Sequence, residues 1–312
     1  MLRNILVPLD GSTFGEQALP LALSIAGRAG AILHLLHVHR PLEATYAEMQ
    51  VFDATLNQQI RDREKAYLQA TSAAVRAVAK TQVTALCKDG DIATTIKEHI
   101  ENSAVDLVVM MTHGRGPMGR FWLGSTTDQL LRETPAPLLL VHPRDKEADL
   151  GADVDFKHLL IPLDGTSLAE QILNPATTLA QLWGAPLTLL RVVKPVMPMN
   201  LPVGSAASFG EMAHHMMERV DVLQEQLKKD THSYLEQVAV RLRGQGMTVD
   251  TQVAVEEQPG VAILQHAQPP IDLIALETHG RRGLSRLILG SVADKVIRGA
   301  HVPVLVQRPS PK

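Results

Sequence analysis

The sequence has one cysteine, Cys87, among its 312 residues, so an internal disulfide is impossible. It also has no apolar stretch of roughly 18 residues, the length that a membrane-spanning helix needs, because charged or helix-breaking residues interrupt each candidate. Residues 1–8 lack the long apolar region of a secretory signal. We therefore expect a protein of the reducing cytoplasm that does not enter a membrane.

A surplus of charge of one sign is also missing. The net charge is -3, with 20% charged and 45% apolar residues, so we expect no bulk attraction to nucleic acid or anionic lipid. No Gly-Lys-Ser or Gly-Lys-Thr phosphate loop occurs, which argues against a Walker-type nucleotide hydrolase. These absences leave a globular protein whose partner has to be inferred from local motifs.

A loop rich in glycine and basic residues occurs twice, at residues 111–126 and 277–292. Nine residues separate Gly114 from Gly124 in the first copy and Gly280 from Gly290 in the second. A chain of this length is comfortable for two domains of about 150 residues, and the repeat makes two the natural count. We expect domains at 1–143 and 156–312, joined by a charged linker at 144–155.

Short apolar segments alternate with helical patterns throughout each half. In the first half the expected strands are residues 5–9, 32–38, 82–86, 105–110 and 137–141, and the expected helices are residues 12–30, 58–80, 91–100 and 125–132. Such alternation predicts an α/β fold with a doubly wound, five-stranded parallel sheet in each domain. The expected strand order is 3-2-1-4-5, in a Rossmann-like or flavodoxin-like arrangement.

The second half repeats the first with an offset of 154 residues at Asp10 and Asp164, but of 166 residues at Thr112 and Thr278. Twelve extra residues must therefore lie between the second and fourth strands of the second half. The proline- and methionine-rich segment 194–217 is their expected place, as a surface loop that either has no role or forms a lid or contact surface.

The repeated motifs fall where an open parallel sheet binds ligands, outside the carboxyl ends of the first and fourth strands. Glycines let backbone N–H groups approach an anion, and a helix that begins at Ser125 adds unpaired donors and a positive dipole end. Ser125 and Thr126 offer hydroxyls, Arg115 a positive charge, and Asp10 an acceptor for a ribose or base. Val38 is placed to flank an adenine.

A structural role for the same residues stays open. The glycines also suit tight turns, and Ser125 and Asp10 also suit helix caps. His113 and His279 have no visible Ser or Cys nucleophile to activate, which favours a loop-orienting role over a catalytic one. The repetition of the whole pattern favours phosphate or nucleotide binding in at least one half.

At these residues the chain resembles a tandem universal stress protein of the nucleotide-binding branch. The resemblance rests on the second motif glycine, the nine-residue spacing, the Gly-Ser that follows, the strand-end aspartates, and Pro303 to Val306 near the C-terminus. It implies ATP as ligand, with a divalent ion such as Mg²⁺ on its phosphates, and a role in stress adaptation without fast catalysis. It also implies pairing of the two halves through their fifth strands, and a homodimer is a further possibility.

Carried over by position, the resemblance implies two nucleotide sites. The first would use Pro8, Asp10, Val38, Gly114, Arg115, Gly124, Ser125 and Thr126, and the second Pro162, Asp164, Val192, Gly280, Arg281, Gly290, Ser291 and Val292. The first glycine of the family motif is replaced by Met111 in one copy and by Glu277 in the other. Because a carboxylate repels phosphates, we hypothesise that the first half binds ATP better.

Two other functions remain open. In one, Met111 and Glu277 have closed the sites, and the chain is a nucleotide-free interaction or scaffold protein. In the other, the chain is a slow ATP hydrolase or another ATP-using enzyme on the same fold. Fold analogy alone does not choose between them.

Overall fold

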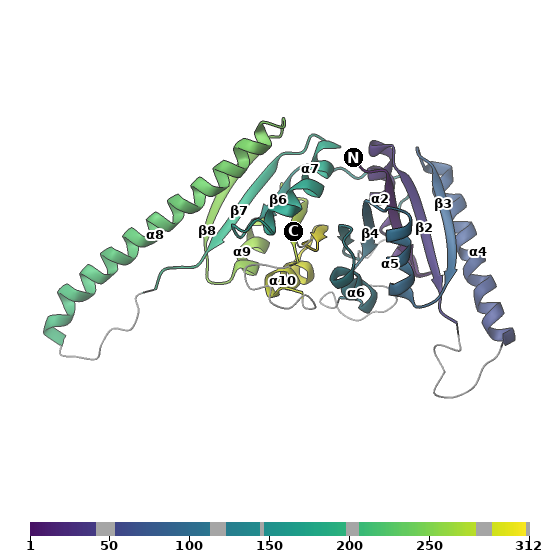
Figure 1. Ribbon diagram of the computed structural model, residues 1–312, viewed down its shortest axis with the longest axis horizontal. Helices are drawn as coiled ribbons and strands as arrows, with labels where there is room; N and C mark the ends of the chain where they lie inside the picture. Colours follow the sequence, from purple (N-terminus) through teal and green to yellow (C-terminus); the bar gives the residue numbers. More distant parts are fainter. Residues whose placement is uncertain (42–53, 113–122, 144–146, 198–205, 279–288, 310–312) are drawn as a thin grey trace.

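The strands of the described residues lie in one sheet (Figure 1). The computed structural model describes residues 1–41, 54–112, 123–143, 147–197, 206–278 and 289–309. The sheet has ten strands in the order β3-β2-β1-β4-β5-β10-β9-β6-β7-β8. Each half therefore has its strands in the order 3-2-1-4-5, so the predicted fold class and strand order are confirmed.

The strands are short and mostly buried, as expected for a parallel sheet with both faces covered. The first half contributes β1 (Asn4–Leu9), β2 (Ile32–His39), β3 (Val83–Asp89), β4 (Leu107–Met111) and β5 (Leu138–Val141). The second half contributes β6 (Leu159–Pro162), β7 (Leu187–Val193), β8 (Val249–Val255), β9 (Leu273–Glu277) and β10 (Val304–Gln307).

The helices cover the two faces of the sheet and separate the core into two layers. The first half has α1 (Thr13–Glu16), α2 (Leu19–Ala29), α4 (Ala54–Val78), α5 (Ile92–Asn102) and α6 (Ser125–Glu133). The second half has the 3₁₀ helix η2 (Ala169–Ile172), α7 (Leu173–Gln181), α8 (Ala206–Arg243), α9 (Pro259–His266) and α10 (Ser291–Gly299). One core layer packs under α2, α4, α7 and α8, and the other under α5, α6, α9 and α10.

The two halves meet at the centre of the sheet. There β5 and β10 pair antiparallel, with Leu139 opposite Leu305, whereas the pairs within each half are parallel. All three residues of β10 that pair with β5 are fully buried. The apolar cores are therefore continuous from one half to the other.

The helix expected at residues 12–30 is broken into two. Ser12 caps α1 by accepting a hydrogen bond from the N–H of Gly15, and α2 starts with Pro20 in its first turn. Proline lacks the N–H that a continuous helix would use, so it is tolerated at a helix start and breaks a helix interior. Gly30 ends α2 in the left-handed conformation, at a φ of 65°.

The inserted segment of the second half is the clearest departure from expectation. Residues 194–217 were expected to form a surface loop, but α8 already begins at Ala206. The helix has 38 residues and its counterpart α4 has 25, so a longer helix accounts for an extension of about the required length. Among the side chains of α8 whose burial is described, those of residues 214–243, the first buried one is Thr231, and Figure 1 shows the helix running beyond β8.

Asp91 caps α5, the helix that leads into β4, and offers a simple test of local stability. Its side chain accepts hydrogen bonds from the N–H of Thr94 at 3.1 Å and from its hydroxyl at 2.8 Å. Asp91→Ala is expected to lower the free energy of unfolding by about 1 kcal/mol, the usual contribution of such a cap. Asp91→Asn should retain most of it, because the amide oxygen can accept the same bond. Equal losses in urea unfolding would argue against the cap.

Candidate functional site

The first candidate site, centred on Asp10, Gly124 and Ser125, lies where β1 and β4 end side by side. Ile5 pairs with Leu107 and Leu6 with Val108, and the same parallel register carried forward brings the end of β1 alongside Met111. The strand order places β2 and β3 on one side of this pair and β5 on the other. This is the point at which strand order reverses, where open α/β sheets bind ligands.

Two hydrogen bonds hold the start of α6 against the end of β4. The N–H of Gly124 donates to the carbonyl of Thr112 at 2.9 Å, and the hydroxyl of Thr127 donates to the carbonyl of Met111 at 3.3 Å. Ser125 is the exposed first residue of the helix, and Thr126 follows it half-buried. The predicted hydroxyls are thus at the helix start, as expected.

In the part of the chain that the structure describes, the start of α6 has no side-chain cap, a feature that it shares with α2, α7, α9 and α10. Within the described residues, no side chain caps the helix at Gly124, although Ser12 caps α1 and Asp91 caps α5. The unpaired N–H groups of a first helical turn and the positive end of its dipole favour an anion. The arrangement therefore has the chemistry of a phosphate cradle.

Asp10 has a structural task in addition to any task in binding. Its Oδ1 accepts hydrogen bonds from the N–H of Ser12 at 3.0 Å and from the hydroxyl of Ser12 at 2.6 Å. A Cβ on Gly15 would come within 2.6 Å of the same oxygen, so glycine permits this close approach. Asp10 therefore has a structural role, because its carboxylate stabilises the turn after β1.

The second candidate site, centred on Asp164, Gly290 and Ser291, repeats this geometry. The N–H of Gly290 donates to the carbonyl of Thr278 at 2.8 Å, and α10 likewise has no side-chain cap. Asp164 accepts hydrogen bonds from the N–H and the hydroxyl of Thr166 at 2.8 and 2.6 Å. Both halves therefore keep the strand-end aspartate and the uncapped helix.

The remaining predicted residues divide into those that the structure places and those that it does not describe. Pro8 lies within β1 and Pro162 ends β6, while Val38 and Val192 lie near the ends of β2 and β7 and pack against the core layer of α5 and α9. Val292 is the half-buried second residue of α10. Gly114, Arg115, Gly280 and Arg281 lie outside the described residues, as do His113 and His279.

An arginine distinguishes the second site from the first. The guanidinium group of Arg191 lies against Gly165, where an added Cβ would approach it to 2.7 Å, and over the ring of Tyr234 at 5.0 Å. The residue at the corresponding place in the first half is His37, which instead contacts the ring of Tyr67. The carboxyl end of β6 thus carries a positive charge that is fixed at any physiological pH.

Met111 and Glu277, which replace the first motif glycine, are both buried. Alternation along the strands directs them to the face of α2 and α7, away from α6 and α10. Glu277 is only 8% exposed, and among the described residues neither of its carboxyl oxygens has a hydrogen-bond partner. Its burial raises the pKa of this carboxyl to about 9. The predicted repulsion of phosphates requires an ionised carboxylate, and burial disfavours that form near neutral pH.

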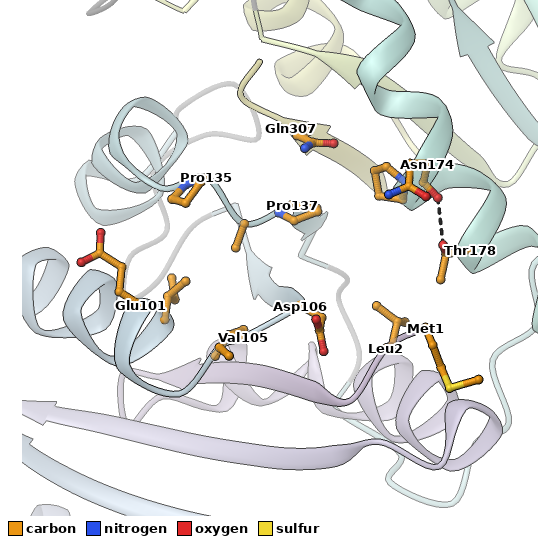
Figure 2. A pocket seen from close by; sticks show the side chains of 14 residues that line it. Met1, Leu2, Glu101, Val105, Asp106, Pro135, Pro137, Asn174, Thr178 and Gln307 are labelled. Carbon is orange, nitrogen blue, oxygen red and sulfur yellow. Dashed lines mark hydrogen bonds between the residues drawn. The ribbon is translucent and has the colours of Figure 1, made fainter. Parts of the chain in front are cut away.

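A pocket of about 440 Å³ lies elsewhere, between the two halves (Figure 2). Its lining includes Leu2, ahead of β1, Pro137, ahead of β5, and Asn174 on α7. Leu2 and Pro137 are at the amino ends of β1 and β5, the opposite edge from Asp10. Neither Ser125 of the first candidate site nor Asp164 and Ser291 of the second lines the pocket, which is therefore not part of either site.

The sequence matches the model of the universal stress protein family over residues 1–142 and again over residues 155–308. The chain belongs to this family. A universal stress protein from Mycolicibacterium smegmatis is 27% identical over 314 residues, which cover 98% of this chain and 97% of that protein. One from Thermus aquaticus is 31% identical over 141 residues, which cover 45% of this chain and 99% of that protein.

A solved structure shares the fold of the whole chain. The universal stress protein from Archaeoglobus fulgidus superposes with a TM-score of 0.65 at 18% identity, and the match covers 98% of this chain and 96% of that one. At this identity the likeness shows the fold alone. The predicted resemblance to a tandem universal stress protein is confirmed.

Two searches of the described residues bear on the expected partners. None of the described helices is long and apolar enough to cross a membrane. In the same residues, no group of three or more His, Cys, Asp or Glu side chains could hold a metal ion.

One polar cluster was not predicted from the sequence. It lies between β2 and α4 and is formed by His37, His39 and Glu64. Two histidines at alternate positions of an expected strand were a usable signal, because such side chains share a face. Their partner on α4 is 25 residues further along the chain than His39. The sequence gives no sign of that contact, since α4 follows a long connection.

Proposed function

We propose that this universal stress protein binds ATP at its first candidate site and serves in stress adaptation or regulation without fast turnover. The observation that carries the proposal is the uncapped start of α6 next to the turn of Asp10, at the reversal of strand order. In this proposal the phosphates accept hydrogen bonds from the first N–H groups of α6 and from Ser125 and Thr126. Val38 and Pro8 would border the adenosine, with Arg115 and Gly114 completing the phosphate contacts.

We propose further that the second site binds ATP more weakly. Asp164, Gly290 and Ser291 reproduce the cradle, but Arg191 occupies the surface of the turn after β6. The two halves would thus act as unequal sites in one molecule, joined through β5 and β10.

Calorimetric titration of the full-length chain with Mg·ATP tests this proposal. The expected isotherm has one tighter site per chain and a second site at least tenfold weaker. ADP and GTP serve as comparison ligands, and mass spectrometry of the purified protein would identify any nucleotide that it retains. Two equal sites would contradict the inequality, and no heat with any nucleotide would contradict binding itself.

A nucleotide-free interaction protein is the second candidate, and the geometry of Asp10 favours it. One carboxylate oxygen of Asp10 already accepts two hydrogen bonds within its own turn, as in Asp164, which is the structural role expected without a ligand. The absence of retained nucleotide together with a flat titration would favour this candidate. Steady release of phosphate above the buffer rate would instead favour the slow hydrolase.

A further inference from the structure

Two histidines near the end of β2 are buried beneath α4 in the first half. His37 is 3% exposed and His39 is 1% exposed, and alternation along the strand directs both toward the same face. Glu64 on α4 reaches both rings, since its carboxylate lies 2.6 Å from Nδ1 of His39 and 3.5 Å from Nε2 of His37. One carboxylate thus joins a long helix to two rings on the sheet.

The tautomer of His37 follows from its other contact. Its Nδ1 lies 2.8 Å from the carbonyl oxygen of Leu9, and a carbonyl can only accept, so Nδ1 carries the proton. In the neutral ring, Nε2 then has a lone pair that faces Glu64 Oε1. This nitrogen is buried, and it has no hydrogen-bond partner among the described residues. Two acceptors therefore face each other across 3.5 Å, one proton short of a hydrogen bond.

His39 fixes the other side of the carboxylate. Its Nδ1 donates to Glu64 Oε2, because a carboxylate can only accept, and its Nε2 lies 3.2 Å from Oδ1 of Asn57, which accepts from this nitrogen when it too carries a proton. Glu64 therefore receives one hydrogen bond from His39 in every state. Its other oxygen, Oε1, faces Nε2 of His37 and can accept a hydrogen bond when that nitrogen is protonated.

The surroundings supply few other charges. Burial, together with the charge of Glu16 on α1, raises the pKa of the Tyr67 hydroxyl, so this phenol beside His37 stays neutral. Burial likewise raises the pKa of the Cys87 thiol on β3, the register partner of His37. Arg61 on α4 is paired with Asp89 on β3 at 2.6 Å. Among the described residues, Lys65 on α4 acts on Cys87 and Asp10 after β1 acts on Tyr67, so both charges lie near the cluster.

The second half has no such cluster. The offset of 154 residues places Arg191 and Val193 at the positions of His37 and His39. Tyr67 and Tyr234 each contact the residue at this place on the second strand, and that correspondence puts Thr231 at the position of Glu64. The permanent cation of Arg191 thus replaces His37, and the apolar side chain of Val193 replaces His39. The neutral hydroxyl of Thr231 replaces the Glu64 carboxylate. The chemistry is therefore specific to the first half and is not a requirement of the fold.

We propose that His37, Glu64 and His39 form a buried proton-binding site. When a proton is bound there, the site stabilises the contact of α4 with the ends of β1 and β2. A proton on Nε2 of His37 turns the two facing acceptors into a charge-assisted hydrogen bond with Glu64. Because Nδ1 of the same ring holds the carbonyl of Leu9, the bound proton completes a chain of contacts from β1 through β2 to α4. The contact of α4 with the sheet therefore becomes stronger on acidification, because the hydrogen bond forms between a protonated His37 and an ionised Glu64.

The proposal is independent of nucleotide, since it rests on contacts within the fold. A metal ion is a less suitable occupant, because no group of three ligand side chains among the described residues could hold one. Imidazole is the side chain that ordinarily exchanges a proton between roughly pH 5 and pH 8, and the same range is convenient for measurement.

Nitrogen-15 NMR of the full-length chain, freed of metal with a chelator, tests the proposal directly. The ring signals of His37 are followed as the pH is lowered from neutrality, and Nε2 is expected to change from a lone-pair to a protonated nitrogen. In parallel, amide exchange in α4, corrected for its intrinsic pH dependence, should slow on acidification. With one coupled proton the effect is at most about tenfold per pH unit.

Glu64→Gln is the deciding variant, because it keeps the size of the side chain. Its amide oxygen can accept from His39 while its NH₂ group donates to the lone pair of His37, so no extra proton is needed. The pH response of α4 should then disappear. Glu236→Gln on α8, a glutamate that contacts Arg243 and Thr251, is the matched control and should leave that response unchanged.

Three results would overturn the proposal. His37 Nε2 could keep its lone pair down to acid unfolding, or Glu64→Gln could retain the pH response of α4. Stoichiometric Zn²⁺ could also slow α4 exchange at neutral pH in the original chain and have no effect on Glu64→Gln, which would assign the cluster to a metal ion. Since the measurements follow a ring nitrogen and the amides of α4 and not bound nucleotide, none of these results decides whether the proposed site binds ATP.

Discussion

Replacing Glu277 by methionine is expected to raise the free energy of unfolding at neutral pH by up to about 3 kcal/mol. Burial raises the pKa of this carboxyl from its ordinary 4.5 to about 9, so the folded chain holds a proton that the unfolded chain has lost. Over the roughly 2.5 pH units between 4.5 and neutrality, this difference in proton binding lowers the free energy of unfolding by about 3 kcal/mol. Methionine is the natural residue at the matching place, where Met111 is buried in the first half.

The sign of the pH dependence provides a second check. A group whose folded pKa is raised supports the fold fully below its unfolded pKa, and this support is lost as the pH rises toward the folded value. Stability should thus fall between about pH 4.5 and about pH 9 in the original chain, and less steeply in Glu277→Met. Met111→Glu is the reciprocal variant and should add a comparable loss. Parallel stability curves for the original chain and Glu277→Met would show that the carboxyl is not held neutral.

The fold was predictable because its signals are local and repeated. The strand-forming segments are short apolar runs, and the crossover rule then limits the order of the strands. The break between α1 and α2 was also visible in principle, since Pro20 lies inside the expected helix. The course of α8 was not predictable in the same way. Proline, glycine and methionine suggested a loop in residues 194–217, whereas the structure shows a helix from Ala206.

The helix starts at the candidate sites could be predicted from the sequence, whereas the protonation state of the buried Glu277 could not. Spacing placed Ser125 and Ser291 at helix starts beside the strand-end aspartates, as the structure shows. The state of Glu277 could not be inferred, because it depends on burial by residues distant in sequence. The contact of His37 and His39 with Glu64 was equally hidden, since a sequence pattern shows which residues share a face and not what covers that face.

Ser125→Glu is expected to weaken ATP binding at the tighter site by at least tenfold, which corresponds to about 1.4 kcal/mol. A carboxylate at the first residue of α6 would compete with the phosphates for the helix N-terminus. Two like charges about 4 Å apart repel by about 4 kcal/mol at an effective dielectric of 20, and solvent at this exposed position reduces that value. The fold should tolerate the change, because acidic residues are favourable in a first helical turn.

Ser291→Glu is the matched control, since Ser291 is the exposed first residue of α10 in the same geometry. It should leave the tighter site unchanged and remove only the weaker one, and both variants should unfold at the same denaturant concentration as the original chain. Ser125→Ala, which deletes only one hydroxyl, should have a smaller effect than Ser125→Glu. If Ser291→Glu abolishes the tighter site, the order of the two halves is the reverse of that proposed. If neither variant alters the isotherm, the phosphates do not lie at the starts of α6 and α10.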